Sequence, residues 1–136
     1  MIVPDEQLKN SGVAEQISGW YRGRIVNITS LRPLTVIKDD AIPLLLRQVR
    51  DSTFVTINTS DFWRRITAER HYCVTCFPLP DDRVDEISNL LRRPFRLVEF
   101  KTKRARQGKV TLVSHAQVQY YQVYDSQVHL LAWPEE

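Results

Sequence analysis

The stretch STFVTINTSDFW, residues 52–63, decides the fold class. Its first half is an apolar, β-branched run that predicts a buried strand over residues 53–57. The run stops at Asn58, and the chain resumes at Phe62 with a predicted helix that reaches about residue 69. A buried strand followed by small oxygen-bearing side chains is typical of a parallel α/β sheet, in which ligands bind beyond the carboxyl ends of the strands.

Asp61 has two interpretations at this point. It can cap the following helix, by accepting hydrogen bonds from free backbone N–H groups near Trp63 and Arg64. It can also offer a carboxylate to a binding site at the end of the strand. Because such caps are common, other residues have to support the second interpretation.

The rest of the first hundred residues alternates strands and helices. Further strands are predicted at residues 2–3, 24–28 and 72–77. One helix carries apolar residues from Leu8 to about Tyr21, one opens at 38–43, and one opens at 80–82 and ends at 92–94. This order predicts a Rossmann-like three-layer α/β fold, with a mostly parallel sheet and helices on both of its faces.

The last part of the chain has a different pattern. Residues 110–113, 117–124 and 127–133 alternate apolar with polar side chains, which predicts antiparallel strands with turns at 115–116 and 125–126. We expect them to extend the same sheet. The prediction is therefore one domain over residues 1–136, with a core of about 1–100 and a C-terminal β extension of about 108–133.

Length and composition are those of a globular domain. The chain has 136 residues, 43% hydrophobic and 26% charged, and its net charge of +3 permits a polyanionic partner without requiring one. The apolar run at 42–46 is far too short to span a membrane, and the first residues lack the regions of a signal peptide. A cytoplasmic protein without membrane partners is expected.

Cys73 and Cys76 form a C-x-x-C motif, which invites a redox or zinc interpretation. The motif lies in a predicted strand, where positions three apart face opposite sides, and no second pair of cysteines exists to complete a zinc site. We therefore interpret both as buried core thiols.

A cluster of positive charge follows the last predicted helix. Residues 92–109 hold eight basic residues against Glu99 alone, either as a solvated surface or as a nucleic-acid contact. The basic residues are Arg92, Arg93, Arg96, Lys101, Lys103, Arg104, Arg106 and Lys109. The terminal strands add aromatic residues that either stack bases or pack in a core or a homodimer interface, namely Tyr120, Tyr121, Tyr124 and Trp133.

Acidic residues recur at the predicted carboxyl ends of the strands. Asp5 follows the first strand, Asp39 and Asp40 open a helix, and Asp61 follows the strand at 53–57 with Asn58 beside it. A parallel sheet brings these positions to one side. Clustered carboxylates repel one another unless a cation neutralises them, and oxygen ligands suit Mg²⁺ or Mn²⁺, which serve phosphodiester cleavage.

Three motifs resemble those of the PIN-like domains, in particular the small solitary branch akin to toxin ribonucleases. That branch looks like D-E-N-L, then D-x-x-I, then V-T-x-D-x-D-F. This chain has D-E-Q-L at residues 5–8, D-D-A-I at 39–42 and V-T-I-N-T-S-D-F at 55–62. The resemblance extends from residue 1 to about residue 123.

The resemblance implies a fold and a site. The fold is that of a PIN-like domain, and Asp5, Asp39 and Asp61 fall on its catalytic acidic positions, with Asp40 as a further metal ligand. Asn58 stands where an aspartate is usual, and one extra residue separates it from Asp61. The amide can offer an oxygen without a charge, so we expect weaker binding of the cation.

Two functional hypotheses follow. The first is a Mg²⁺- or Mn²⁺-dependent ribonuclease, in which the basic residues hold the RNA backbone and an antitoxin-like protein is a partner. The second is a non-catalytic PIN-like module that binds RNA or a protein. A nucleotide-binding domain is disfavoured, because four glycines in the whole chain supply no Gly-rich phosphate loop.

Overall fold

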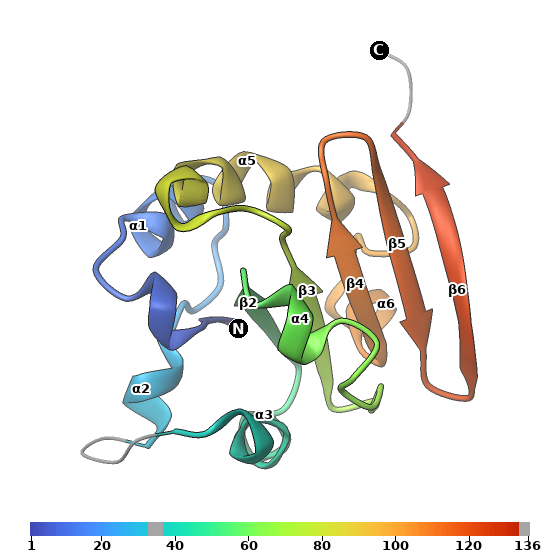
Figure 1. The fold of residues 1–136 in the computed structure, drawn as a ribbon, viewed down its shortest axis with the longest axis horizontal. Helices are drawn as coiled ribbons and strands as arrows, with labels where there is room; N and C mark the ends of the chain where they lie inside the picture. Colours follow the sequence, from blue (N-terminus) through green and yellow to red (C-terminus); the bar gives the residue numbers. More distant parts are fainter. Residues whose placement is uncertain (33–36, 134–136) are drawn as a thin grey trace.

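One mixed sheet organises the protein, whose computed structural model describes residues 1–32 and 37–133 (Figure 1). Its six strands lie in chain order, from β1 to β6. The first four run parallel: β1 (Ile2–Pro4), β2 (Ser52–Thr56), β3 (Tyr72–Cys76) and β4 (Lys109–Val113). Then β5 (Gln117–Gln122) and β6 (Asp125–Ala132) continue it antiparallel. This confirms the predicted α/β class and its antiparallel C-terminal extension.

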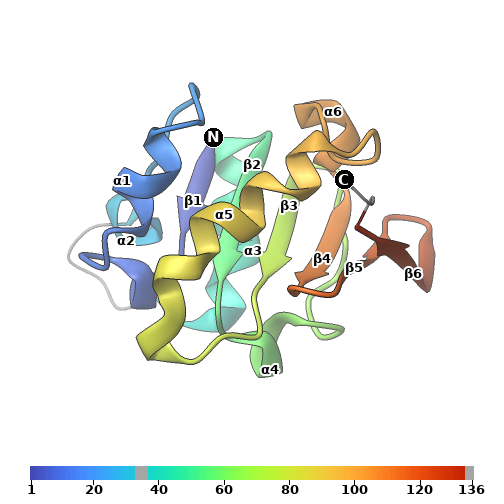
Figure 2. The ribbon, with the colours of Figure 1, turned by 90° about the horizontal axis from the view of Figure 1, so that it is seen from above.

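Helices cover both faces of the sheet, which makes three layers (Figures 1 and 2). On one face pack α1 (Val13–Ser18) and α5 (Ile87–Arg92), and on the other α2 (Ile28–Leu31), α3 (Ile42–Val49) and α4 (Thr59–Phe62). Short helical turns complete the connections: η1 (Glu6–Leu8), η2 (Asp39–Ala41), η3 (Asp81–Glu86), η4 (Pro94–Arg96) and α6 (Lys103–Arg106).

The continuous apolar run of β2 explains this layering. Successive side chains of a strand point to opposite faces, so Phe54 joins the core beneath α3 and Val55 joins the core beneath α1 and α5. Both side chains are fully buried. A strand that is buried on both faces needs a helical layer on each side.

Cys73 and Cys76 are free and buried, as predicted. Cys76 belongs to the core beneath α3, and Cys73, three positions away, faces the other side of the sheet. Burial raises the pKa of the Cys73 thiol to about 11 and that of Cys76 to about 12. These thiols are therefore packing groups and not a redox pair.

Two predictions in the first third of the chain were wrong. The strand at 24–28 is reduced to a single bridge between Ile25 and Ile2, because Asn27 precedes a helix and the chain turns into α2. The helix expected from Leu8 to Tyr21 is interrupted at Gly12, whose φ of 88° is left-handed, so that only α1 remains.

The predicted helix at 62–69 was also misplaced. Helix α4 begins three residues earlier, at Thr59, and ends at Phe62. Trp63 is extended and Arg64 has a φ of 63°, a left-handed conformation that no helix continues through. Asp61 therefore lies inside α4, and the interpretation of this residue as a cap was wrong.

The C-terminal strands differ in two details. Residues 110–113 pair parallel with β3, so the antiparallel part begins only at β5. The last turn falls at Val123 and Tyr124 instead of 125–126, because Gln122 pairs with Asp125 and Tyr124 adopts a φ of 67°. In the described part of the chain, no helix is long and apolar enough to cross a membrane.

Candidate functional site

Asp5 is a buried carboxylate at the carboxyl end of the sheet, by which we mean the side where β1–β4 end. Only 6% of the residue is exposed. Its two oxygens accept hydrogen bonds of 2.7 Å from the Glu6 backbone N–H and from Oγ1 of Thr56, the last residue of β2. Burial raises the pKa of Asp5, although both hydrogen bonds act in the opposite direction. The neighbouring strand thus holds this carboxylate in place.

Asp39 and Asp61 form an acidic pair in front of the same end. Burial raises the pKa of Asp39, and a hydrogen bond to Asp61 together with the charges of Asp61, Asp5 and Asp40 raises it further. The pKa of Asp61 is lowered instead, by a hydrogen bond from Asn58 and then by that from Asp39. Neighbouring carboxylates repel each other, and a proton or a cation relieves that repulsion.

Asn58 orients one member of the pair. Its Nδ2 donates to Oδ2 of Asp61 at 2.7 Å, and its Oδ1 accepts from the hydroxyl of Ser60 at 3.3 Å. The Asn58 backbone N–H donates to Oγ1 of Thr56 at 3.0 Å, the same hydroxyl that holds Asp5. Thr56 and Asn58 therefore link the buried carboxylate to the exposed one.

The acidic pair opens onto a pocket of about 490 Å³, which Asp39, Asp40 and Asp61 line together with Arg47 and Arg65. Arg47 is bound to Glu69, with 2.8 Å between Nε and Oε2. Arg65 is exposed, and its charge contributes to the lowered pKa of Asp61. Two exposed guanidinium groups thus line the pocket, and only that of Arg47 forms an ion pair in the described part of the chain, so Arg65 is the one that could bind a phosphate group.

Some of the acidic residues at this end of the sheet are placed to bind a hard cation. Within residues 1–32 and 37–133, no group of three or more His, Cys, Asp or Glu side chains is placed to hold a metal ion. Both oxygens of Asp5 already accept hydrogen bonds, whereas Asp39, Asp40 and Asp61 are exposed at the pocket, and the pKa shifts of Asp39 and Asp61 show that these two interact. Mg²⁺ is commonly held by one or two carboxylates, with water and substrate phosphate as the remaining ligands. The pair fits that arrangement, and the predicted four-aspartate set does not form one group.

The basic residues of α6 lie at the other end of the sheet, whereas Arg93 reaches the carboxyl end of β4, where it donates to the backbone oxygen of His115. Helix α6 directly precedes β4, so its side chains lie at the amino end of the parallel strands, whereas Asp5, Asn58 and Asp61 follow carboxyl ends. Figure 2 shows α6 and the chain start at the top and α4 at the bottom. The structure therefore separates the basic residues of α6 from the carboxylates.

Three of the eight basic residues have internal contacts. Arg106 is buried, Lys109 Nζ donates to the backbone oxygens of Glu99 and Ala105, and Arg93 donates to that of His115. The others are exposed, namely Arg92, Arg96, Lys101, Lys103 and Arg104.

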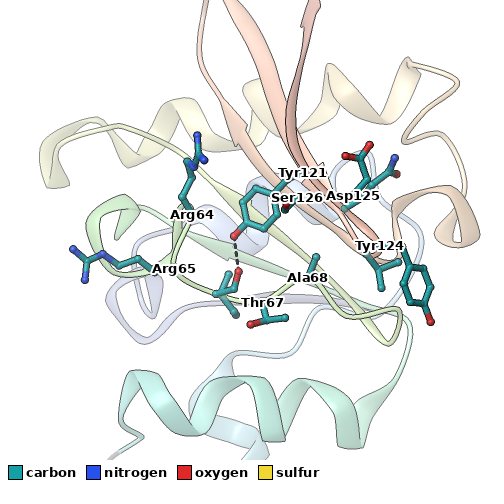
Figure 3. Close-up of a pocket in the computed structure, with 11 residues that line it drawn as sticks. Arg64, Arg65, Thr67, Ala68, Tyr121, Tyr124, Asp125 and Ser126 are labelled. Carbon is teal, nitrogen blue, oxygen red and sulfur yellow. Dashed lines mark hydrogen bonds between the residues drawn. The ribbon is translucent and has the colours of Figure 1, made fainter.

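A second pocket, of about 510 Å³, lies between residues 64–68 and the hairpin of β5 and β6 (Figure 3). The hydroxyl of Tyr121 donates to the backbone oxygen of Ile66 at 2.5 Å and ties the two segments together. Arg65 lines this pocket as well as the acidic one. Tyr120 and Tyr121 are buried, as the core interpretation expected, whereas Tyr124 is 92% exposed.

Sequence reasoning missed Thr56 and Arg65. Thr56 belongs to the apolar run of its strand, and nothing local shows that its hydroxyl faces Asp5. Arg65 lies three residues after the motif at 55–62. A search for basic residues near the acidic motifs could have found it.

No protein-family model matches the chain, and no significant match was found among curated proteins or solved structures. The resemblance to PIN-like domains therefore stays a prediction from the three motifs.

The raised pKa of Asp5 predicts a specific pH dependence of stability. The folded protein holds this proton more tightly than the unfolded chain, so the stability contributed by protonated Asp5 is present below its ordinary pKa of 3.8 and is lost as the pH rises through the higher folded value. Asp5→Asn removes this titration. We therefore expect the free energy of unfolding of Asp5→Asn, relative to that of the wild type, to increase as the pH rises from the ordinary pKa of Asp5 through its higher folded value. A chelator keeps metal ions out of the comparison.

Urea unfolding at several pH values between about 3 and about 8 measures this difference. A difference that stays flat, or one that falls as the pH rises, contradicts the buried and unneutralised state of Asp5.

Proposed function

We propose that this protein is a PIN-like, divalent-metal-dependent ribonuclease with its site at the carboxyl end of the sheet. One observation carries the proposal: Asp39, Asp40 and Asp61 line one pocket there, and the neighbouring carboxylates Asp61 and Asp5 contribute to the raised pKa of Asp39. Structural carboxylates are normally held in ion pairs, and neither Asp39 nor Asp61 forms one within the described part of the chain, which suggests a functional site.

Each residue has a distinct part in this proposal. Asp39 and Asp61 would hold Mg²⁺ or Mn²⁺, which supplies an activated water and stabilises negative charge on the phosphate. Asp5 is too buried to contact the substrate, and its negative charge acts on Asp39. Arg65 is exposed at the pocket and would position a phosphate group of the RNA backbone.

Asn58 tunes the site toward weak binding. Its amide donates to Asp61 and keeps that carboxyl group ionised, which favours binding of a cation. The same amide supplies no charge of its own, and the affinity of hard cations depends strongly on the charge of their ligands. The proposed enzyme therefore works at high concentrations of metal.

The test is cleavage of a short labelled single-stranded RNA by purified protein, with Mn²⁺ or with a chelator. Cleavage should require Mn²⁺. It should fall by at least about 100-fold in Asp61→Asn, because the loss of a residue that only supports a metal ligand already costs up to about 100-fold, and Asp61 is proposed as a direct ligand. The control Glu15→Gln, which neutralises an exposed carboxylate on α1, should cleave like the wild type. Equal cleavage by wild type and Asp61→Asn would show that a contaminant is responsible and would remove the proposal.

A second function is supported by a different observation. The basic residues of α6 and the acidic pair lie at opposite ends of the sheet, so one short RNA segment does not contact both. This favours a non-catalytic PIN-like module that binds RNA or an antitoxin-like protein. Such a module would bind RNA but would not cleave it, even as Asn58→Asp with saturating Mn²⁺.

A further inference from the structure

We propose that a pocket at the amino end of the sheet binds a phosphate group of single-stranded RNA, with Arg106 as its buried positive charge. The pocket measures about 310 Å³ and lies between the end of α1 and the segment from α5 to α6. Its lining contains five basic residues and no acidic one: Arg22, Arg92, Arg96, Lys101 and Arg106. The proposal does not depend on cleavage at the acidic pair.

Arg106 is the observation that points to an anion. It is only 5% exposed, and its Nη1 donates to the backbone oxygens of Phe100 at 2.9 Å and Lys101 at 3.3 Å. Its Nε is buried without a partner, and no carboxylate pairs with it among the described residues. A guanidinium stays charged in proteins, and a buried charge without a counter-charge is strongly unfavourable. An anion in the pocket would supply the missing counter-charge.

Aromatic side chains fix the geometry of the pocket. Trp20 packs edge-on against Phe95, with 5.6 Å between ring centroids, and its Nε1 donates to Oγ of Ser88 at 2.9 Å. The guanidinium carbon of Arg106 lies 4.0 Å from the centroid of the Phe95 ring. These contacts hold the end of α1 against η4 and so bring Arg22 close to Arg96, although 74 positions separate them in the sequence.

A second basic pocket at the same end favours a chain over a free ion. It measures about 560 Å³ and is lined by Arg70, Lys103 and Arg104 together with Gln107 and one carboxylate, that of Asp51. Helix α6 connects the two pockets, since it carries Lys103 and Arg104 in one and Arg106 in the other. Successive phosphates of a flexible strand can occupy both pockets, whereas a single phosphate ion occupies one.

The test measures binding of a short single-stranded RNA by fluorescence anisotropy, with a chelator present to prevent cleavage. The variant combines Arg22→Ala with Arg96→Ala, two exposed residues whose replacement should leave the melting temperature unchanged. We expect it to bind at least roughly tenfold more weakly, and to have a shallower salt dependence by about 0.7 per lost phosphate contact. Asp61→Asn should bind like the wild type, which separates this site from the proposed catalytic one.

Two controls make the result specific. Arg83→Ala removes an exposed arginine of η3 that is already paired with Glu86, and it should leave RNA affinity unchanged. Inorganic phosphate should compete with RNA for the wild type only at much higher concentration. If the double variant binds RNA with wild-type affinity and salt dependence, or if phosphate alone binds as tightly as RNA, the proposal is overturned.

Discussion

Replacing Phe54 by alanine is expected to destabilise the fold by about 3–5 kcal/mol, the usual cost of removing a buried phenyl ring. Phe54 is fully buried in β2 and packs edge-on against Phe62, with 5.3 Å between ring centroids. Because Phe62 is the last residue of α4, the cavity would also loosen the helix that carries Asp61. The same substitution should therefore weaken any metal binding at the acidic pair.

Urea denaturation of wild type and variant measures the change. Leu44→Ala is the matched control, because Leu44 is 56% exposed on α3 and its loss should cost no more than about 0.5 kcal/mol. A cost below about 1 kcal/mol for Phe54→Ala would contradict a tightly packed core at this position.

The sequence was sufficient to predict the arrangement of β2 and its neighbours. A continuous apolar, β-branched run such as 53–57 indicates a strand that is buried on both faces. Burial on both faces is typical of a parallel sheet that lies between two layers of helices. From that topology it followed that Asp5, Asn58 and Asp61 would all lie at the carboxyl end. These predictions depend on strand order alone, so small errors in the helix boundaries did not affect them.

Other features depend on tertiary contacts that a local pattern does not contain. Residues 24–28 look like a strand, but a single bridge to Ile2 is all that the turn into α2 allows. Arg106 looks like Arg104 in the sequence, yet one is buried against Phe95 and the other is exposed. The basic cluster was predicted without its location, because its position relative to the carboxylates depends on how far α5 carries the chain back along the sheet.

Asn58→Asp is expected to strengthen Mn²⁺ binding by at least roughly tenfold, since hard cations respond to the charge of their oxygen ligands. The new carboxylate would replace the amide that now donates to Asp61 at 2.7 Å. Without metal, this substitution exchanges a hydrogen bond for a repulsion, so the variant should be less stable than the wild type in a chelator. Mn²⁺ should reverse the difference, because a ligand that binds only the folded state stabilises it.

Thermal unfolding with and without Mn²⁺ follows both effects. Asp61→Asn should respond to Mn²⁺ least, and the control Glu15→Gln should respond like the wild type. A stabilisation by Mn²⁺ that is the same in all four proteins would place the metal somewhere other than the acidic pair.

Calorimetric titration of Mn²⁺ into the metal-free wild type, Asn58→Asp and Asp61→Asn tests the central claim most directly. The proposed site predicts weak binding to the wild type, tighter binding to Asn58→Asp and none to Asp61→Asn. No binding to either the wild type or Asn58→Asp, with salt-sensitive RNA binding intact, would contradict the claim and identify the protein as a binding module.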